Sequence, residues 1–204
     1  MISLFDCTDD RMSNAKSGAW WVDHRHRALA NNSAVYENRR PDMEFFFKKW
    51  GELYASKSGE PGFFSRYAAQ KVAARSERRD ANQEFGCNPC SEILLRPFQM
   101  CNLTEIVVRA NDTDETLKRK ARVAAILGMI QSSFTDFKYV RKIWKDTCNE
   151  ERLLGVSLTG VCDNPGLLGR PDLLEELRNV VIETNAEWAD RLGINRSTAT
   201  TCVN

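Results

Sequence analysis

The stretch Cys87-Asn-Pro-Cys-Ser-Glu-Ile-Leu-Leu95 joins a thiol, an amide and a carboxylate to the start of a short apolar run. Asn88, Cys90 and Glu92 alternate along the chain, so their side chains would point to the same side of an extended backbone. A further thiol, Cys101, follows eleven residues after Cys90. The spacing therefore predicts a small cluster of Asn88, Cys90 and Glu92, with another cysteine close behind it in the sequence.

Outward from this stretch, apolar runs that are typical of strands alternate with helical patterns. The predicted strands are 2–5, 92–95, 103–108, 153–158 and 199–203. The predicted helices are 40–54, 66–79, a third that begins near 112, and 171–192. This alternation indicates an α/β fold with largely parallel strands, and it places Cys90 where a loop meets a strand, which is where such folds usually carry their chemistry.

The apolar spacing also predicts which side chains of these helices face inward. In the first long helix they are Met43, Phe46, Phe47, Trp50 and Leu53 or Tyr54. In the third helix, which Asp112 and Glu115 would open as a capping box, they are Val123, Leu127, Ile130 and Phe134. In the last helix, which Gly193 would end, they are Leu174, Leu177, Val181, Thr184 and Trp188.

Composition favours an ordinary soluble protein. The 204 residues are 42% hydrophobic and 28% charged, and 29 basic residues nearly balance 28 acidic ones. No overall field therefore favours nucleic acid or an anionic membrane, and direct nucleic-acid binding is not expected. The longest apolar run, 123–130, is far too short to span a bilayer, and no basic-then-apolar leader is present, so we expect a cytoplasmic protein.

Seven cysteines in such a chain fit reduced thiols better than a disulfide framework. Four of them stand alone in the sequence and are expected to be small buried hydrophobes: Cys7, Cys148, Cys162 and Cys202. The chain shows no repeat and no linker-like tract, which argues against an internal domain boundary.

Three other interpretations compete for Cys87, Cys90 and Cys101. A zinc site would suit the Cys87-x-x-Cys90 spacing, but a structural site needs four ligands and the sequence supplies no second pair. A thioredoxin-like dithiol should open a helix, whereas Pro97 follows soon after this motif. The third interpretation is three buried cysteines in a loop without chemistry of their own.

The motif Asn88-Pro-Cys-Ser-Glu92, with Cys101 eleven residues after Cys90, resembles the finger loop of ribonucleotide reductases. Pro89 favours class II, the adenosylcobalamin-dependent enzymes, because class I relatives usually carry leucine before the cysteine. Other segments resemble the family in the same order: Ile2–Asp6 with Ala15-Lys16 and Trp20-Trp21, Arg27–Tyr36, Gly59–Gly62 before Phe63, Gly155–Gly160, and Thr201–Val203.

This resemblance implies a part of the family's ten-stranded α/β barrel, with the finger loop in its centre. It implies that Cys90, as a thiyl radical, abstracts the 3′-hydrogen of the ribonucleotide substrate, and that Glu92 is the general base on the 3′-hydroxyl. Asn88 would hydrogen-bond the sugar hydroxyls, and Cys101 would supply reducing electrons and end in a disulfide that a thioredoxin-like reductant exchanges. Cys87 lies outside the motif core and is expected to be a bystander.

The resemblance further implies that residues 1–204 are the central segment of the catalytic barrel domain, incomplete at both ends. Such a segment needs the missing flanking segments of the same subunit for activity, and the cofactor would be adenosylcobalamin. No residue is assigned to cobalamin contact and no metal ligand is expected. The alternative is a non-catalytic remnant or interaction module that retains the fold without turnover.

Overall fold

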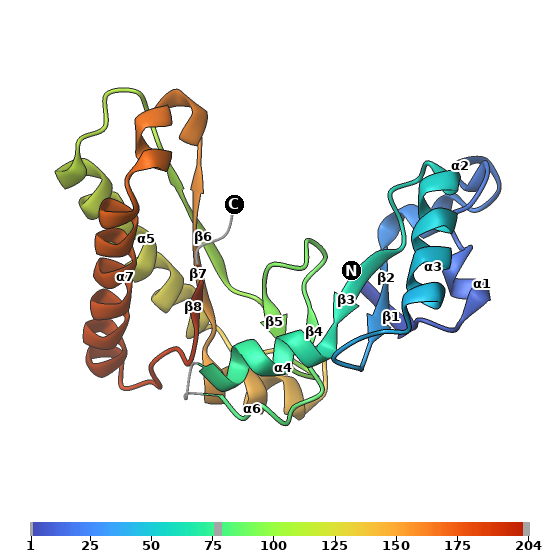
Figure 1. Cartoon of the computed structure of the whole chain (residues 1–204). Helices are drawn as coiled ribbons and strands as arrows, with labels where there is room; N and C mark the ends of the chain where they lie inside the picture. The colour runs from blue at the N-terminus through green and yellow to red at the C-terminus, as the bar shows by residue number, and fades with distance from the viewer. Residues whose placement is uncertain (1, 76–78, 202–204) are drawn as a thin grey trace. The chain divides into compact units, whose positions relative to one another are not determined.

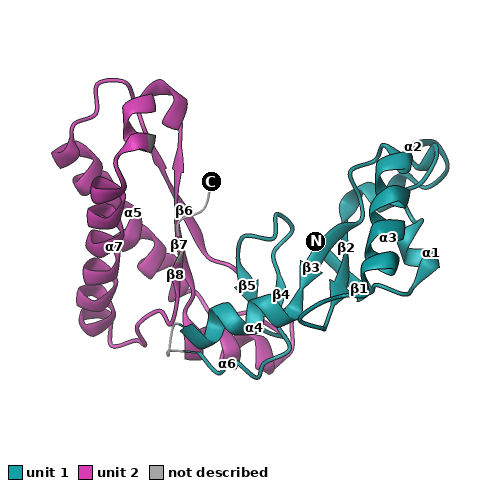
Figure 2. Cartoon of the chain, viewed as in Figure 1, with its two compact units in different colours: residues 1–97 teal, residues 98–204 magenta. Residues whose placement is uncertain are grey.

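The computed structural model describes residues 2–75 and 79–201, which fold into two compact units, Met1–Pro97 and Phe98–Asn204 (Figure 2). The α/β prediction is confirmed, since helices alternate with short strands along most of the chain (Figure 1). The sequence argued against an internal domain boundary, but the structure divides into two compact units. The join falls beside Pro97, where no linker-like composition marks it.

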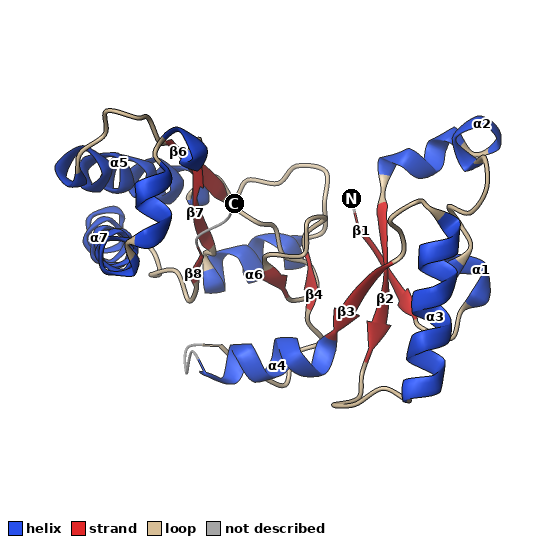
Figure 3. Ribbon diagram, turned by 45° about the horizontal axis from the view of Figure 1, so that its top comes forward, coloured by secondary structure: helices blue, strands red, loops and turns tan. Residues whose placement is uncertain are grey.

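Unit 1 is built on a parallel sheet in the order β1-β2-β3, formed by Ile2–Asp6, Asn31–Tyr36 and Gly62–Ser65. The connections carry α1 (Asp10–Ser13), α2 (Trp20–Asp23), a 3₁₀ turn (Arg25–Leu29) and α3 (Met43–Ser56), and α4 (Arg66–Arg75) follows β3 (Figure 3). The unit ends with a small antiparallel pair, β4 (Gly86–Cys87) and β5 (Leu94–Leu95).

The central strand β2 is buried on both faces. Ala34 and Tyr36 pack with Phe46 of α3, whereas Val35, which points the other way, packs with Ala69 of α4. A strand between two layers reads as a continuous apolar run rather than an alternating one. Residues 33–36 of β2 are all buried in this way, although this segment was not predicted as a strand.

Helix α3 occupies the predicted segment but does not bury the predicted stripe. Asp42 caps it by accepting a hydrogen bond from the Phe45 backbone N–H at 2.8 Å. Of the residues predicted to face inward, Phe46 does so, but four are more than half exposed: Met43, Phe47, Trp50 and Tyr54. The predicted face was therefore wrong over most of its length.

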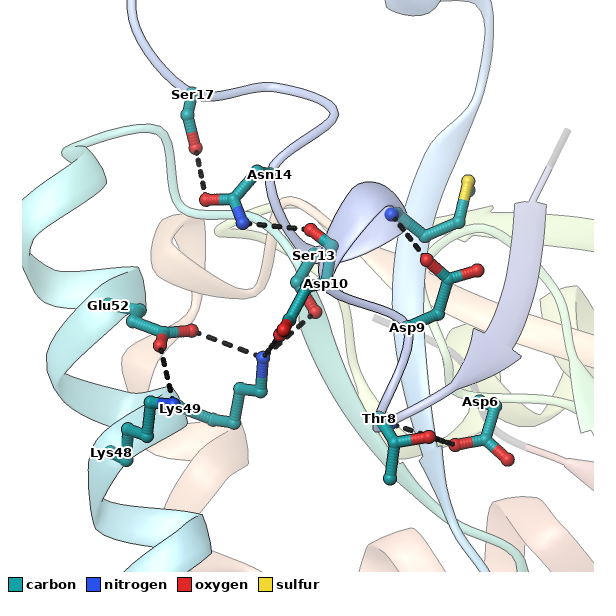
Figure 4. A network of polar contacts seen from close by, with 11 residues as sticks. Asp6, Thr8, Asp9, Asp10, Ser13, Asn14, Ser17, Lys48, Lys49 and Glu52 are labelled. Carbon is teal, nitrogen blue, oxygen red and sulfur yellow. Dashed lines mark hydrogen bonds and ion pairs between the residues drawn. The ribbon is translucent and has the colours of Figure 1, made fainter.

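The inner side of α3 instead carries a buried cation, Lys49, which is 7% exposed. Its Nζ lies 2.6 Å from Asp10 Oδ1 in α1 and 3.3 Å from Glu52 Oε2, and it lies 3.5 Å from Ser13 Oγ (Figure 4). Lys48 points outward and only approaches Glu52, at 4.0 Å. Lys49 thus joins α1 to α3, and the two adjacent lysines have different surroundings.

Unit 2 contains a second parallel sheet in the order β6-β7-β8, from Leu103–Val107, Leu154–Thr159 and Thr200–Thr201. Helices α5 (Asp114–Ser132) and α7 (Pro171–Leu192) pack against each other, and α5 packs on β6 and β7 (Figures 1 and 3). Helix α6 (Lys142–Glu151) and 3₁₀ turns at Val161–Asp163 and Pro165–Gly169 complete the unit. The predicted strands at 103–108 and 153–158 are confirmed, and α6 was not predicted.

Helix α5 shows why periodicity alone selected the wrong face. Its cap is Thr113, which forms a capping box with Thr116, rather than Asp112 with Glu115. Three of the residues predicted to face inward are at least half exposed: Val123, Leu127 and Phe134. The buried face consists of Leu117, Ala121, Ala124, Ala125, Gly128 and Met129. Small residues line it because the helix lies close to β7: a Cβ on Gly128 would stand 2.2 Å from Leu154 Cδ1.

Helix α7 matches its prediction well. It spans Pro171–Leu192 and ends at Gly193, whose φ of 63° is the left-handed conformation that glycine adopts without strain. Leu177, Val181 and Thr184 are buried as predicted, and Leu174 and Trp188 are partly buried against the same core. Of the described residues, none belongs to a helix both long and apolar enough to cross a membrane.

Candidate functional site

The motif forms a tight turn between β4 and β5 instead of an extended strand. The backbone N–H of Ser91 donates to the Asn88 carbonyl at 2.9 Å, and that of Asn88 donates to the Ile93 carbonyl at 3.2 Å. Pro89 occupies the second turn position, which its fixed φ favours, and Ser91 has a φ of 69°. The expectation of an extended backbone was therefore wrong, and Cys90 lies exposed at the corner of the turn.

The turn nevertheless brings the predicted amide and carboxylate together across its base. Asn88 is 4% exposed, its Oδ1 accepts from the Ile93 backbone N–H at 2.9 Å, and its Nδ2 donates to Glu92 Oε1. The second oxygen, Glu92 Oε2, is buried and has no hydrogen-bond partner among the described residues. One carboxylate oxygen is thus held in place while the other retains its full capacity to accept a hydrogen bond.

Cys87 is a structural thiol. It is 3% exposed and its Sγ donates to Ser91 Oγ at 3.6 Å, which joins the first strand to the turn. Burial raises the pKa of Cys87, so its thiol stays protonated at neutral pH. These observations agree with the expectation that Cys87 takes no part in the reaction.

Sequence reasoning missed one residue that positions the loop. Asn31, at the start of β2, donates from Nδ2 to the Pro89 carbonyl at 2.9 Å, one residue before Cys90. The only signal in the sequence was that Asn31 lies within the Arg27–Tyr36 segment, which resembles the family. The contact links the corner of the turn to the parallel sheet of unit 1.

The remaining cysteines differ in exposure. Cys101 is exposed in unit 2, just before β6, where it lines a pocket of about 190 Å³. Of the four cysteines that were predicted to be buried, Cys162 is exposed and Cys7 and Cys148 are half-buried. Cys202 lies outside the described residues, as does most of the Thr201–Val203 segment. In the described part of the chain, no group of three or more His, Cys, Asp or Glu side chains is placed to hold a metal ion.

Comparison with known proteins first indicates the class of protein that this chain resembles. No protein-family profile matches the chain. In fold, it resembles the crystal structure of a B12-dependent, class II ribonucleotide reductase, with a TM-score of 0.70 at 21% sequence identity, over 98% of this chain and 31% of the other. At that identity the likeness establishes the fold.

A particular relative follows from sequence. The chain is 28% identical over 166 residues to the adenosylcobalamin-dependent ribonucleoside-triphosphate reductase of Lacticaseibacillus paracasei. The match covers 79% of this chain and 21% of the relative, so the chain spans about a fifth of the relative's length. The resemblance to class II ribonucleotide reductases is therefore confirmed, and both relatives are described as adenosylcobalamin- or B12-dependent.

Proposed function

We propose that this chain carries the finger-loop segment of a class II ribonucleotide reductase and contributes to the reduction of ribonucleotides to deoxyribonucleotides by a thiyl-radical mechanism. The observation that carries the proposal is the turn at 88–92. It exposes the Cys90 thiol at its corner and holds Glu92 against Asn88 at its base, and Glu92 Oε2 has no hydrogen-bond partner in the part of the chain that the structure describes. A site that binds a polyol needs such a positioned acceptor next to its reactive group.

The side chains support distinct roles. Cys90, as a thiyl radical, takes the 3′-hydrogen of the ribose, and Glu92 accepts the 3′-hydroxyl proton through Oε2. Asn88 donates to Glu92 and accepts from Ile93, so it positions the base, and its second amide hydrogen remains available for a sugar hydroxyl. Cys101 supplies electrons and becomes part of a disulfide that a thioredoxin-like protein reduces.

The proposed cofactor is adenosylcobalamin, which when bound supplies the radical by homolysis of its own cobalt–carbon bond. Cys90 is the residue that we propose as the acceptor, because its thiol is exposed at the corner of the turn. The proposal assigns no residue of this chain to holding the corrin ring.

At the level of fold, the sheets β1-β2-β3 and β6-β7-β8 are proposed to be parts of the family's ten-stranded barrel. All strand pairs within each sheet are parallel, as that barrel requires of neighbouring strands within one half. Within the described residues each of these sheets has three strands, so flanking segments of the same subunit would complete the barrel by pairing with the sheet edges.

The test is a chimera in which this chain replaces the aligned segment of the Lacticaseibacillus paracasei reductase. Deoxynucleotide formation is measured with adenosylcobalamin and a dithiol reductant. Cys90→Ala should abolish turnover, whereas Cys162→Ala, a change at another exposed cysteine, should leave it intact. Full activity of the Cys90→Ala chimera would contradict the proposal, and a folded chimera without turnover would support the non-catalytic alternative.

A further inference from the structure

The direction of the Cys90 side chain depends on one peptide group, the one between Pro89 and Cys90. The Ser91 N–H closes the turn onto the Asn88 carbonyl at 2.9 Å, so this central peptide group stands outside the hydrogen bond that defines the turn. Its orientation distinguishes a type I from a type II turn. Cys90 has a negative φ, which fits type I, whereas type II requires a positive φ at this position.

Asn31 holds this peptide group from outside the turn. Its Nδ2 donates at 2.9 Å to the Pro89 carbonyl, which belongs to the peptide bond that leads into Cys90. A flip toward the type II form would turn that carbonyl away from Asn31, and it would force a positive φ on Cys90, which is unfavourable for a residue with a Cβ. The hydrogen bond and the backbone preference therefore support the same orientation of the thiol.

An ion pair beneath the sheet fixes Asn31 from both sides. Lys16 is buried, and its Nζ donates to Glu60 Oε1 at 2.9 Å and to the Ala30 carbonyl at 2.6 Å. The other oxygen, Glu60 Oε2, accepts from the Asn32 backbone N–H at 3.0 Å. The residue before Asn31 and the residue after it are thus bound to the same pair, so the start of β2 has little freedom to move.

Asn31 itself contributes little to the core. It is the exposed first residue of β2, and the five residues that follow it are buried. A substitution at this position can therefore release the turn and leave the sheet intact. Loss of Glu60 is more costly, because the charge of Lys16 would then be buried without its partner.

We propose that Asn31 is a positioning residue for the Cys90 thiol, and that the Lys16–Glu60 pair holds Asn31 where it can act. The inference rests on the proposed function, in which Cys90 must lie within reach of the 3′-hydrogen of the ribose. A displacement of about 1 Å at a reacting atom can cost about a hundredfold in rate. Asn31 donates to the backbone of the loop, so it influences the reaction through the placement of Cys90.

The first experiment uses the full chain and needs no turnover. Nitrogen-15 relaxation and relaxation dispersion follow the Cys90 N–H on the picosecond-to-nanosecond and microsecond-to-millisecond timescales. In the unchanged chain this group should be rigid, with an order parameter of about 0.85, and Asn31→Ala should add motion on one of these timescales. Asn31→Asp, which keeps the shape of the side chain but lacks the donor, should do the same.

The matched control is Asn38→Ala, because Asn38 is an exposed asparagine beyond the other end of β2, and it should leave the Cys90 N–H unchanged. The urea midpoint of Asn31→Ala should stay that of the unchanged chain. If the Cys90 N–H of Asn31→Ala is as rigid as that of the unchanged chain, the inference is wrong.

The second experiment uses the chimera with the Lacticaseibacillus paracasei reductase. Asn31→Ala and Asn31→Asp should lower kcat by about tenfold to a hundredfold and leave KM unchanged, because the thiol is misplaced while the groups that bind substrate remain. Asn31→Gln keeps an amide donor and should recover part of kcat, and Asn38→Ala should retain all of it.

The outcomes separate this inference from the proposed function. If the chimera turns over, depends on Cys90 and keeps its kcat in Asn31→Ala, the inference is overturned and the proposed function stands. A chimera without turnover counts against the proposed function, and the relaxation measurements on the full chain then decide the inference alone.

The ion pair is tested by combining substitutions. Glu60→Gln removes the charge but keeps an oxygen for the Asn32 N–H, so it is milder than Glu60→Ala. It should increase the motion of the Cys90 N–H in the unchanged background and add nothing in the Asn31→Ala background, because both changes act through one contact. Independent, additive effects of the two substitutions would overturn the link between the pair and Cys90.

Discussion

At the scale of single residues, Asn88 has two roles: it holds the turn together, and it is proposed to position Glu92 for the reaction. Replacing Asn88 with alanine leaves the Ile93 N–H without its acceptor and Glu92 Oε1 without its donor. We expect a loss of about 1–3 kcal/mol in the free energy of unfolding, because both groups are partly or fully buried. Urea denaturation measures this loss.

The matched control is Asn38→Ala, since Asn38 is exposed after β2, and it should change stability by less than about 0.5 kcal/mol. Equal effects of the two substitutions would show that the side-chain bonds of Asn88 do not hold the turn.

The residues of this loop also show what sequence can predict. The association of Asn88 with Glu92 was predicted correctly, but from an extended backbone that does not exist. Pro89 in a four-residue turn overrode the alternation of side chains, and a helix-or-strand pattern does not describe such local turn chemistry. The unpartnered Glu92 Oε2 and the contact of Asn31 with Pro89 depend on tertiary packing, so no spacing in the sequence could reveal them.

At the scale of secondary-structure elements, two helical glycines should respond oppositely to alanine. Gly128→Ala in α5 places a Cβ 2.2 Å from Leu154 Cδ1 and should destabilise the protein by about 1–3 kcal/mol through overpacking. Gly51→Ala in α3 meets nothing within 4 Å and should stabilise it by about 0.5–1 kcal/mol through helix propensity. The free energy of unfolding of both variants is measured by thermal or urea denaturation. If both substitutions change it in the same direction, this account of α5 packing is refuted.

The link between α1 and α3 should depend on pH. The hydrogen bond and charge of Lys49 hold the pKa of Asp10 below its usual range. Burial lowers the pKa of Lys49, but its hydrogen bonds to Asp10 and Glu52 outweigh this and raise it. The stabilisation from Asp10 is therefore present above about pH 4 and lost as pH falls through its lowered pKa. That from Lys49 is present below about pH 10.4 and lost as pH rises through its raised pKa.

The measurement compares the free energy of unfolding of the unchanged chain with that of Lys49→Met across this range. The difference should stay nearly constant between about pH 5 and pH 9 and shrink on acidification below about pH 4. Lys48→Met, which alters only an exposed neighbour, should give a small difference at every pH. A Lys49→Met difference that persists unchanged in acid would argue against the ion pair with Asp10.

The ends of the helices were easier to predict from the sequence than the sides that they bury. Capping and breaking residues placed α7 between Pro171 and Gly193, because such signals act locally along the chain. The inner face of α5 was missed because four of its six buried residues are alanines or Gly128, which the search for large apolar residues overlooks. The predicted Val123 and Leu127 of that helix instead remain at least half exposed, as many apolar side chains do on ordinary protein surfaces.

At the scale of the whole molecule, the division into two units predicts that unit 2 folds alone. Its core is drawn entirely from its own segment, from Ile106 to Ala189. A chain of residues 98–204 should therefore unfold cooperatively in urea and keep near-ultraviolet circular dichroism. Residues 128–204, which lack β6 and most of α5, should not. If neither fragment shows a cooperative transition, the core of unit 2 is insufficient by itself.

The parallel pairing of every strand in the two three-stranded sheets has a consequence for how the chain is made. Each pairing must wait for a long crossover, residues 7–30, 37–61, 108–153 or 160–199, so the sheets form from contacts distant in sequence and fold slowly. Unit 1 is complete at Pro97, while the 107 residues of unit 2 (204 minus 97) need roughly 5–20 s more of synthesis. The loop that bears Cys90 can thus reach its turn conformation before the strand that follows Cys101 has found its partner.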